Sequence, residues 1–274
     1  MRRTLAASLA LTALLLGTTR TLTAQQDDDR WLRHCRRDND DDQVRFCEVR
    51  HLGFKPSSST LTFDPDQNGG VDITGWDRDS VAVSARVGAG DRNDQDARAL
   101  AAEVKVEISG STVRVDGPAH HHHANWSVEL VVMVPRKIGI HAETTNGPLS
   151  VEGVNGAIDV RATNGPVTLS RLAGDVHARV QNGPLSVRLD GTAWNGTGLD
   201  AESTNGPVDL AIPEHYNAEL ETGTVNGPTD FRMPITVTLA GRRSDRIHTT
   251  LGKGGSPVRV VTTNGPLTVR RAVD

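Results

Sequence analysis

Aromatic side chains and catalytic signatures are what this sequence has least of. Only 3% of its 274 residues are Phe, Trp or Tyr. The core must therefore be built from Val, Leu, Ile and Ala, which suits a narrow interior of short side chains. The sequence also lacks a Gly-x-Ser-x-Gly nucleophile turn, a Walker loop and a His-Glu-x-x-His pair. These absences exclude the enzyme classes that the motifs mark, and we expect neither an enzyme nor a cofactor.

Long hydrophobic runs are also scarce. The one apolar stretch covers residues 5–16, follows Arg2 and Arg3, and precedes small residues at 21–24. This pattern predicts a signal peptide over 1–24, with an uncleaved anchor as the alternative. The stretch is too short to cross a bilayer comfortably, and no second one follows, so we expect no membrane span in the mature chain. The protein is then exported, to the periplasm or the cell surface.

Positive charge is limited. The formal net charge is -4, and removal of the three arginines in the expected signal peptide brings it to about -7 (-4 minus 3). A nucleic-acid-binding protein normally carries a basic surface, so this balance argues against nucleic acid as a partner.

Cysteine occurs only twice, as Cys35 and Cys47. Two close cysteines in an exported protein usually form a disulfide. Such a bond closes a loop of about a dozen residues, worth roughly 3 kcal/mol. A metal site would need further ligands, and His34 alone is too little. We therefore predict a structural disulfide that closes an acidic N-terminal segment, residues 25–59.

Residues 60–143 are expected to form an N-terminal β region. Short alternating segments are separated there by Gly, Asn and Asp, as is typical of strands and turns. One short helix should interrupt them, because apolar residues recur at i, i+3, i+4 and i+7: Ala97, Leu100, Ala101 and Val104.

Residues 144–274 contain a repeat marked by Asn-Gly-Pro. Five consecutive nine-residue units run from Thr145 to Leu189, and alternate units match each other best. The pattern predicts an all-β chain with a parallel β-solenoid of about 18 residues per turn. Asn-Gly also favours hairpins, so an antiparallel meander is the alternative. Proline after glycine counts against it, since proline fits the first residue of a strand better than its interior.

The Asn-Gly pairs should form the corners of this coil. Both residues tolerate a positive φ, and equivalent side-chain amides are expected to stack as a ladder. The motif returns at Asn226 and Asn264 after longer insertions. The predicted structural turn ladder consists of Asn146, Gly147, Asn164, Gly165, Asn182, Gly183, Asn205 and Gly206.

Several short motifs, in this order, resemble a known family. They are Cys-Glu-Val-Arg (47–50), Asn-Gly-Gly-Val (68–71), Gly-Trp-Asp-Arg (75–78), Trp-Ser-Val (126–128), Val-Pro-Arg (134–136), Trp-Asn-Gly-Thr-Gly-Leu-Asp (194–200) and Leu-Gly-Lys-Gly-Gly (251–255). Together they resemble bacterial exported β-repeat proteins classed as "putative adhesins", within a domain family of unknown function. The resemblance implies export and a parallel β-solenoid; "adhesin" is a label from fold analogy. The chain departs from the family in its Asn-Gly-Pro turns and its histidine run.

One face of the coil carries the candidate ligand site. Asp159 should neighbour His177 on the adjacent turn, and Arg161 should neighbour Arg179. Two stacked arginines beside a His/Asp pair can hold an anionic sugar or a carboxylate. The alternative is a solvated face whose charges offset one another.

Two further motifs are weaker candidates for metal binding. The run His120–His123 has no acid or cysteine at ligand spacing, so we expect a solvated loop. Residues 64–69, Asp-Pro-Asp-Gln-Asn-Gly, resemble the opening of a calcium loop, but Gly75 stands where a closing Glu is required. We expect a turn there and no metal site.

The sequence thus favours an exported, non-enzymatic binding or scaffold protein. Its partner is expected to be an envelope protein or a glycan. The alternative is a glycan-active enzyme that uses Asp159, Arg161, His177 and Arg179.

Overall fold

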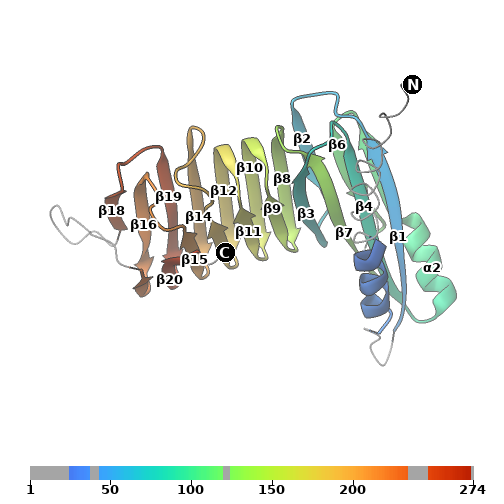
Figure 1. Cartoon of the computed structure of the whole chain (residues 1–274). Coiled ribbons are helices and arrows are strands. Elements are labelled where there is room, and N and C mark those ends of the chain that lie inside the picture. Colours follow the sequence, from blue (N-terminus) through green and yellow to red (C-terminus); the bar gives the residue numbers. More distant parts are fainter. Residues whose placement is uncertain (1–24, 38–42, 120–123, 234–245, 273–274) are drawn as a thin grey trace, which may run out of the picture.

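The computed structural model describes residues 25–37, 43–119, 124–233 and 246–272. The described chain is all-β apart from its helices at the N-terminal end, and its strands form two ten-stranded sheets. The two sheets run along an elongated stack, with the helices at one end of it (Figure 1). The predicted signal peptide, residues 1–24, lies outside the described residues.

The first sheet is parallel from β7 to β17 and antiparallel at its N-terminal end, where β1 pairs with β4 and β4 with β7. Its strands, in spatial order, are β1 (Val44–Phe54), β4 (Val81–Asp91), β7 (Asn125–Pro135), β3 (Gly69–Trp76), β9 (Leu149–Glu152), β11 (Val167–Ser170), β13 (Leu185–Arg188), β15 (Val208–Ile212), β20 (Leu267–Arg271) and β17 (Thr229–Arg232).

The second sheet is parallel in its centre and antiparallel at both ends, where β16 pairs with β18 and β5 with β6. Its strands, in spatial order, are β18 (Arg246–Leu251), β16 (Ala218–Asn226), β19 (Pro257–Asn264), β14 (Gly198–Asn205), β12 (Ala173–Asn182), β10 (Asn155–Asn164), β8 (Gly139–Asn146), β2 (Thr60–Asp64), β6 (Thr112–Asp116) and β5 (Lys105–Ser109).

Both sheets are therefore mixed, whereas the sequence predicted a parallel coil. For β5 and β6 the reason is a connection too short for a crossover: Ser109 pairs with Thr112, and Gly110 turns the chain with a φ of 62°. Only an antiparallel partner can be reached by so short a turn. The other antiparallel pairs join strands that are distant in the sequence.

The 18-residue offset holds in the central strands. Asn164 pairs with Asn146 in the second sheet, and Val167 with Leu149 in the first. Alternate side chains of these strands enter the space between the sheets, and ten of them are at most 3% exposed. These residues are Leu149, Val151, Ile158, Val160, Val167, Leu169, Val176, Ala178, Leu185 and Val187.

The Asn-Gly corners bring successive turns into close backbone contact. The Asn164 side-chain amide donates to Asn146 Oδ1 at 2.9 Å, and the Asn182 amide donates to Asn164 Oδ1 at 3.0 Å. At the next position, a Cβ on Gly165 would lie 2.2 Å from the carbonyl oxygen of Gly147. Glycine is required there because no other side chain fits between two backbones at this separation.

The amide ladder extends past the four asparagines of the predicted turn ladder. Asn205 donates to Asn182, Asn264 to Asn205, and Asn226 to Asn264, at 2.8–2.9 Å. The spatial order thus departs from the chain order. β19 and β20 lie between the turn formed by β14 and β15 and the turn formed by β16 and β17.

The N-terminal end has one more helix than the sequence predicted. Residues 25–35 are helical, and the predicted helix is α2 (Asp94–Glu103), with Asn93 as its N-cap. The predicted disulfide is confirmed, with an S–S distance of 2.04 Å between Cys35 and Cys47. It joins the end of the first helix to β1.

Substitutions at Leu169 and Thr168 test the alternation of inward and outward side chains. Leu169→Asp buries a charge in the core and should abolish cooperative unfolding or cost more than about 4 kcal/mol. Thr168 is exposed, so Thr168→Asp should change the free energy of unfolding by about 0.5 kcal/mol or less. Urea unfolding followed by circular dichroism measures both, and equal tolerance would contradict the alternation.

A second prediction concerns the corner glycines. Gly165→Ala must push two backbones apart and should destabilise the protein by about 3 kcal/mol. Gly191→Ala is the matched control, because Gly191 has a φ of 70° but no atom lies within 4 Å of the position that its Cβ would take. The control should cost about 1 kcal/mol, from backbone strain alone. Urea unfolding measures the free energy of unfolding of both variants. Similar losses of stability at the two sites would show that the close backbone approach at Gly165 does not determine the cost of adding a Cβ.

Candidate functional site

The outer face of the second sheet carries three rows of polar side chains. The parallel register places equivalent residues of β8, β10, β12, β14, β19 and β16 side by side. Counted back from each ladder asparagine, the fifth position forms the histidine row, the third the arginine row and the first the threonine row. The histidine row is His141, Asp159, His177, Asp200, Arg259 and Glu221; the arginine row includes Glu143, Arg161, Arg179 and Glu202; the threonine row includes Thr145, Thr163, Gln181, Thr204 and Thr263.

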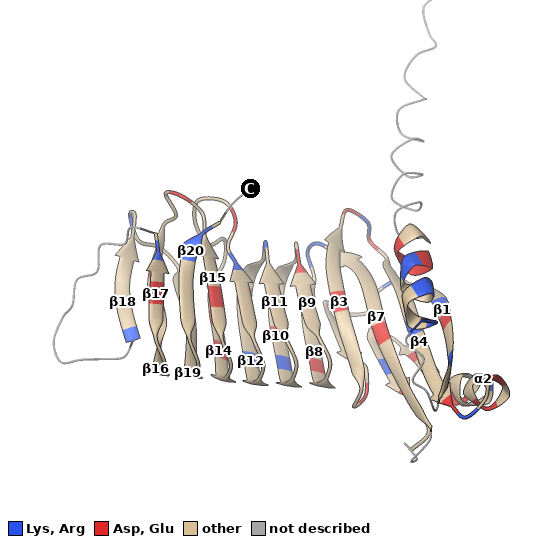
Figure 2. Cartoon of the chain, turned by 90° about the horizontal axis from the view of Figure 1, so that it is seen from below, with Lys and Arg blue, Asp and Glu red and all other residues tan. Residues whose placement is uncertain are grey.

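The four residues predicted from the sequence lie together on this face. Asp159 pairs in register with His177, and Arg161 with Arg179. All four side chains are between 37% and 58% exposed, so a ligand can reach them. Figure 2 shows basic and acidic residues distributed over neighbouring strands of the stack.

Their ion pairs differ from the expected His/Asp pair. Asp159 accepts a hydrogen bond from Arg161 on its own strand at 3.0 Å, and His141 lies 3.6 Å from the same carboxylate. His177 lies 3.2 Å from Asp175, again on its own strand. Within this face, Asp159 therefore contacts Arg161 and His141, and His177 contacts Asp175, so the expected pair is replaced by contacts to other residues.

Arg179 belongs to a cluster that the sequence analysis missed. Its guanidinium donates to Asp200 Oδ2 at 2.5 Å and to the Asp200 carbonyl oxygen at 3.1 Å. Arg259, on β19, donates to Asp200 Oδ1 at 2.6 Å and to Glu202 at 3.0 Å. Asp200 thus joins two arginines from strands on either side of its own.

The pKa of Asp200 follows from these contacts. Partial burial raises the pKa of this carboxyl group, but the hydrogen bonds from Arg179 and Arg259 lower it by more. Its pKa consequently lies below the ordinary value. The Arg259 pKa is raised in turn: burial lowers it, and the hydrogen bonds to Asp200 and Glu202 outweigh that effect. The pair is therefore ionised at neutral pH.

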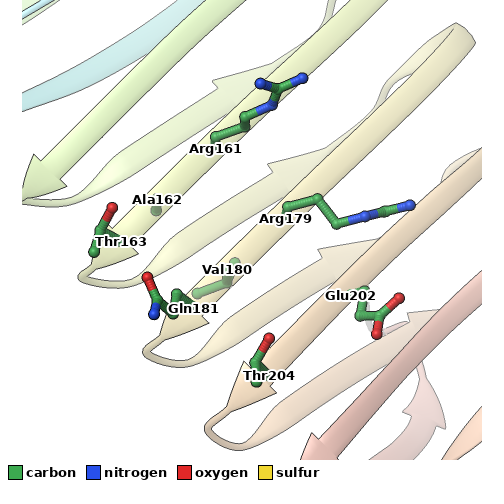
Figure 3. Close-up of a pocket in the computed structure, with 8 residues that line it drawn as sticks. All are labelled: Arg161, Ala162, Thr163, Arg179, Val180, Gln181, Glu202 and Thr204. Atoms are coloured by element: carbon green, nitrogen blue, oxygen red, sulfur yellow. The ribbon is translucent and has the colours of Figure 1, made fainter.

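An open depression of about 330 Å³ lies beside this cluster. Arg161, Arg179 and Glu202 line it from three adjacent strands, and three members of the threonine row line it nearer the corners (Figure 3). The latter are Thr163, Gln181 and Thr204. The depression thus combines two guanidinium groups and the Glu202 carboxylate with neutral hydrogen-bonding side chains.

The two arginines are the chemically informative part of the depression. They occupy directly opposite positions in a parallel pair, where strands are about 4.8 Å apart and like charges destabilise a sheet. Among its described contacts, Arg161 donates to Glu143 and Asp159, which leaves guanidinium N–H groups available to a ligand. An oxyanion that bridges both guanidinium groups would relieve their repulsion.

The sequence contained a signal for the missed residues. Asp200 and Arg259 each stand five positions before a ladder asparagine, as do Asp159 and His177. Counting by nine or eighteen residues fails beyond Leu189, because insertions change the repeat length. Counting back from each Asn-Gly-Pro turn would have found the whole row.

The weaker metal candidates have simple environments where they are described. In the segment 64–69, the Asp66 backbone N–H donates to Asp64 Oδ1 at 3.3 Å, and Asp64 lies 3.7 Å from Arg114. The run His120–His123 lies outside the described residues. In the described part of the chain, no group of three His, Cys, Asp or Glu is arranged to hold a metal ion, and no helix is long and apolar enough to cross a membrane.

Comparisons with known proteins give a distant structural likeness. No family model and no curated protein matches the chain. It is similar to a "putative cell adhesion protein" from Clostridium sporogenes, with 12% identity, a TM-score of 0.43 and coverage of 83% of this chain and 100% of the other. It is also similar to a "putative adhesin" from Bacteroides fragilis, with 11% identity, a TM-score of 0.38 and coverage of 82% and 97%. A "putative lipid binding protein" from Parabacteroides distasonis has 9% identity, a TM-score of 0.32 and the same coverage.

The Asp200 cluster generates a pH prediction. Because the folded-state pKa of Asp200 lies below its unfolded value of about 3.9, its stabilisation is present above about pH 4 and is lost as the pH falls through the folded pKa. At pH 7, Asp200→Asn should lower the free energy of unfolding by about 1 kcal/mol, a value reduced for solvent screening.

Urea unfolding between pH 7 and about pH 2 checks this linkage. The difference between Asp200→Asn and the unsubstituted protein should vanish at the acid end. Asp175→Asn is the control, because the Asp175 side chain is 50% exposed. A difference that persists unchanged in acid would contradict an electrostatic origin.

Proposed function

We propose that the protein is an exported, non-enzymatic binding module built on a β-solenoid core, and that its ligand is a carboxylate-bearing glycan. The observation that carries the proposal is the adjacent pair Arg161 and Arg179 at the depression on the second sheet. Guanidinium groups bind carboxylates through paired N–H donors. Thr163, Gln181 and Thr204 offer hydroxyl and amide groups of the kind that hydrogen-bond sugar hydroxyls.

Export is supported by two features. The sequence pattern over 1–24 predicts a signal peptide, and the Cys35–Cys47 disulfide is typical of proteins outside the cytoplasm. The solenoid proposal rests on the central strands, whose parallel registers advance by 18 residues per turn on both sheets.

A binding role fits the charges better than glycan hydrolysis. A glycosidase general acid needs a raised pKa, so that it carries a proton at the working pH. Asp200 has a lowered pKa, and Asp159 is hydrogen-bonded to Arg161. Both carboxylates are therefore suited to hold the arginines in place for a ligand.

Glycan binding can be tested on an array that pairs polyuronates, such as polygalacturonate, with neutral polysaccharides such as dextran. The protein should bind the polyuronates, and the double substitution Arg161→Ala/Arg179→Ala should weaken binding at least tenfold. Arg188→Ala, on the other sheet, is the control and should leave affinity unchanged. Melting temperatures confirm that all variants are folded.

Three outcomes would overturn the proposal. The first is no binding to any acidic glycan. The second is binding that the double substitution leaves intact. The third is release of reducing ends from a polysaccharide, if Asp159→Ala or His177→Ala abolishes that release. This result would establish the enzymatic alternative.

A further inference from the structure

The strand β1 forms an unusually long edge. It has eleven residues and ends the first sheet, with β4 as its partner. The β1–β4 register is continuous from Val44 opposite Asp91 to Phe54 opposite Val81, with no bulge. By contrast, the terminal strands β17, β18 and β5 have four, six and five residues. Long regular edges invite pairing with another strand, and proteins usually protect them with proline, bulges, short lengths or charged side chains; of these, β1 has only the charges, on Arg45, Glu48 and Arg50.

The two faces of β1 are covered by different helices. Even-numbered residues face α2: Arg98 of this helix lies over the Phe46 ring at 4.5 Å, and Arg50 donates to the Ala101 carbonyl oxygen at 2.7 Å. Odd-numbered residues face the N-terminal helix, to which Cys47 is disulfide-bonded. The helices therefore pack on the faces of β1, and β4 pairs with one of its two edges.

This arrangement restricts how two copies of the chain can pair through β1. Residues opposite each other in an antiparallel pair point to the same side of the sheet. A two-fold axis perpendicular to the sheet must then place even residues opposite even residues. Full overlap of Val44–Phe54 with its copy puts the axis at Val49, the centre of the strand.

In that register the β1 sequence is complementary to itself. Glu48 already accepts a hydrogen bond from Arg50 of its own strand at 2.8 Å, and in the dimer it also lies opposite Arg50 of the second copy, as Arg50 lies opposite Glu48 of the second copy. Phe46 faces Leu52, and Val44, which is 36% exposed and one of two large hydrophobic residues exposed in the described chain, faces Phe54. Moving the axis from Val49 to Glu48 would place Glu48 opposite Glu48 of the second copy. Moving it to Arg50 would place Arg50 opposite Arg50, and both registers bring like charges together.

We propose that the protein forms a two-fold symmetric dimer in which β1 pairs antiparallel with β1 of a second copy, centred on Val49. The pairing joins two ten-stranded sheets into one continuous sheet, with about ten new backbone hydrogen bonds. It also places two copies of the outer face of the second sheet on one rigid body. Two such faces would bind a repetitive ligand more tightly than one, through effective concentration.

Cysteine cross-linking tests the register in the full-length purified protein. Val49→Cys should form a disulfide-linked dimer on mild oxidation, because the two copies of residue 49 face each other across the axis. Leu52→Cys is the matched control: its two copies would be about 20 Å apart, at six residues of about 3.4 Å each, and should not link. An equimolar mixture of Arg45→Cys and Gly53→Cys should give a mixed dimer, and neither should link alone.

Charge substitution tests the interface energetically. Glu48→Arg places like charges opposite each other twice and should weaken dimerisation at least tenfold in sedimentation equilibrium, whereas Glu48→Gln should weaken it less. Near-ultraviolet circular dichroism verifies that both variants keep the native fold. A monomer at every concentration tested would overturn the proposal. The proposal would also be overturned if the protein were a dimer that Glu48→Arg left intact and in which Val49→Cys formed no intermolecular disulfide.

Discussion

The close stacking of backbone at the Asn-Gly corners is the constraint on which the rest of the structure depends. Each corner glycine lies where a Cβ would meet the carbonyl oxygen of the neighbouring turn, as at Gly165 and Gly183. Successive turns can therefore approach to the normal strand spacing along the whole edge. The strands that leave each corner then share one register, and their side chains form continuous rows both in the core and outside it. Without that approach, neither the core ladders nor the charged rows would align.

The alignment has different consequences on the two sides of the second sheet. Inside, rows of Val, Leu, Ile and Ala fill a narrow space, which explains how a chain with few aromatic residues buries a core. Outside, the same register stacks charged residues of adjacent turns. Histidine or arginine alternates with an acidic residue along the histidine row, while Arg161 and Arg179 stand side by side. The fold tolerates this pair because Asp159 accepts a hydrogen bond from Arg161 and Asp200 accepts one from Arg179. The proposed ligand would accept hydrogen bonds from the guanidinium N–H groups that these carboxylates do not contact.

The ends of the stack solve a different physical problem from its middle. A stack of two open sheets has two ends at which core and backbone would be exposed. At the C-terminal end, β18 pairs antiparallel with β16. At the N-terminal end, α2 packs against β1 and β4, and the disulfide fastens the first helix to β1. The edge of β1 is where the proposed dimer continues the sheet, so the covering of the ends and the assembly of the protein are linked.

Much of the central fold could be predicted from the sequence, because its signals are local. Asn-Gly-Pro marks the corner after each of β8, β10, β12, β14, β16 and β19, and alternation identifies Leu149, Val167 and Leu185 as inward residues. The disulfide followed from two cysteines, and α2 from its apolar spacing. The pairs Asp159/His177 and Arg161/Arg179 followed from the constant repeat length.

Other features depended on contacts between segments that are distant in the sequence, and a local sequence pattern does not reveal such contacts. Insertions after Leu189 break the constant spacing, so only the tertiary structure places β19 between β14 and β16. The same placement brings Arg259 to Asp200, across 59 residues, and so completes the cluster beside the candidate site. The antiparallel pairs β1–β4 and β16–β18 likewise join strands that are distant in the sequence. Strand register can be counted along a chain only while the repeat is constant; beyond that point, burial and hydrogen bonding between whole strands choose the neighbours.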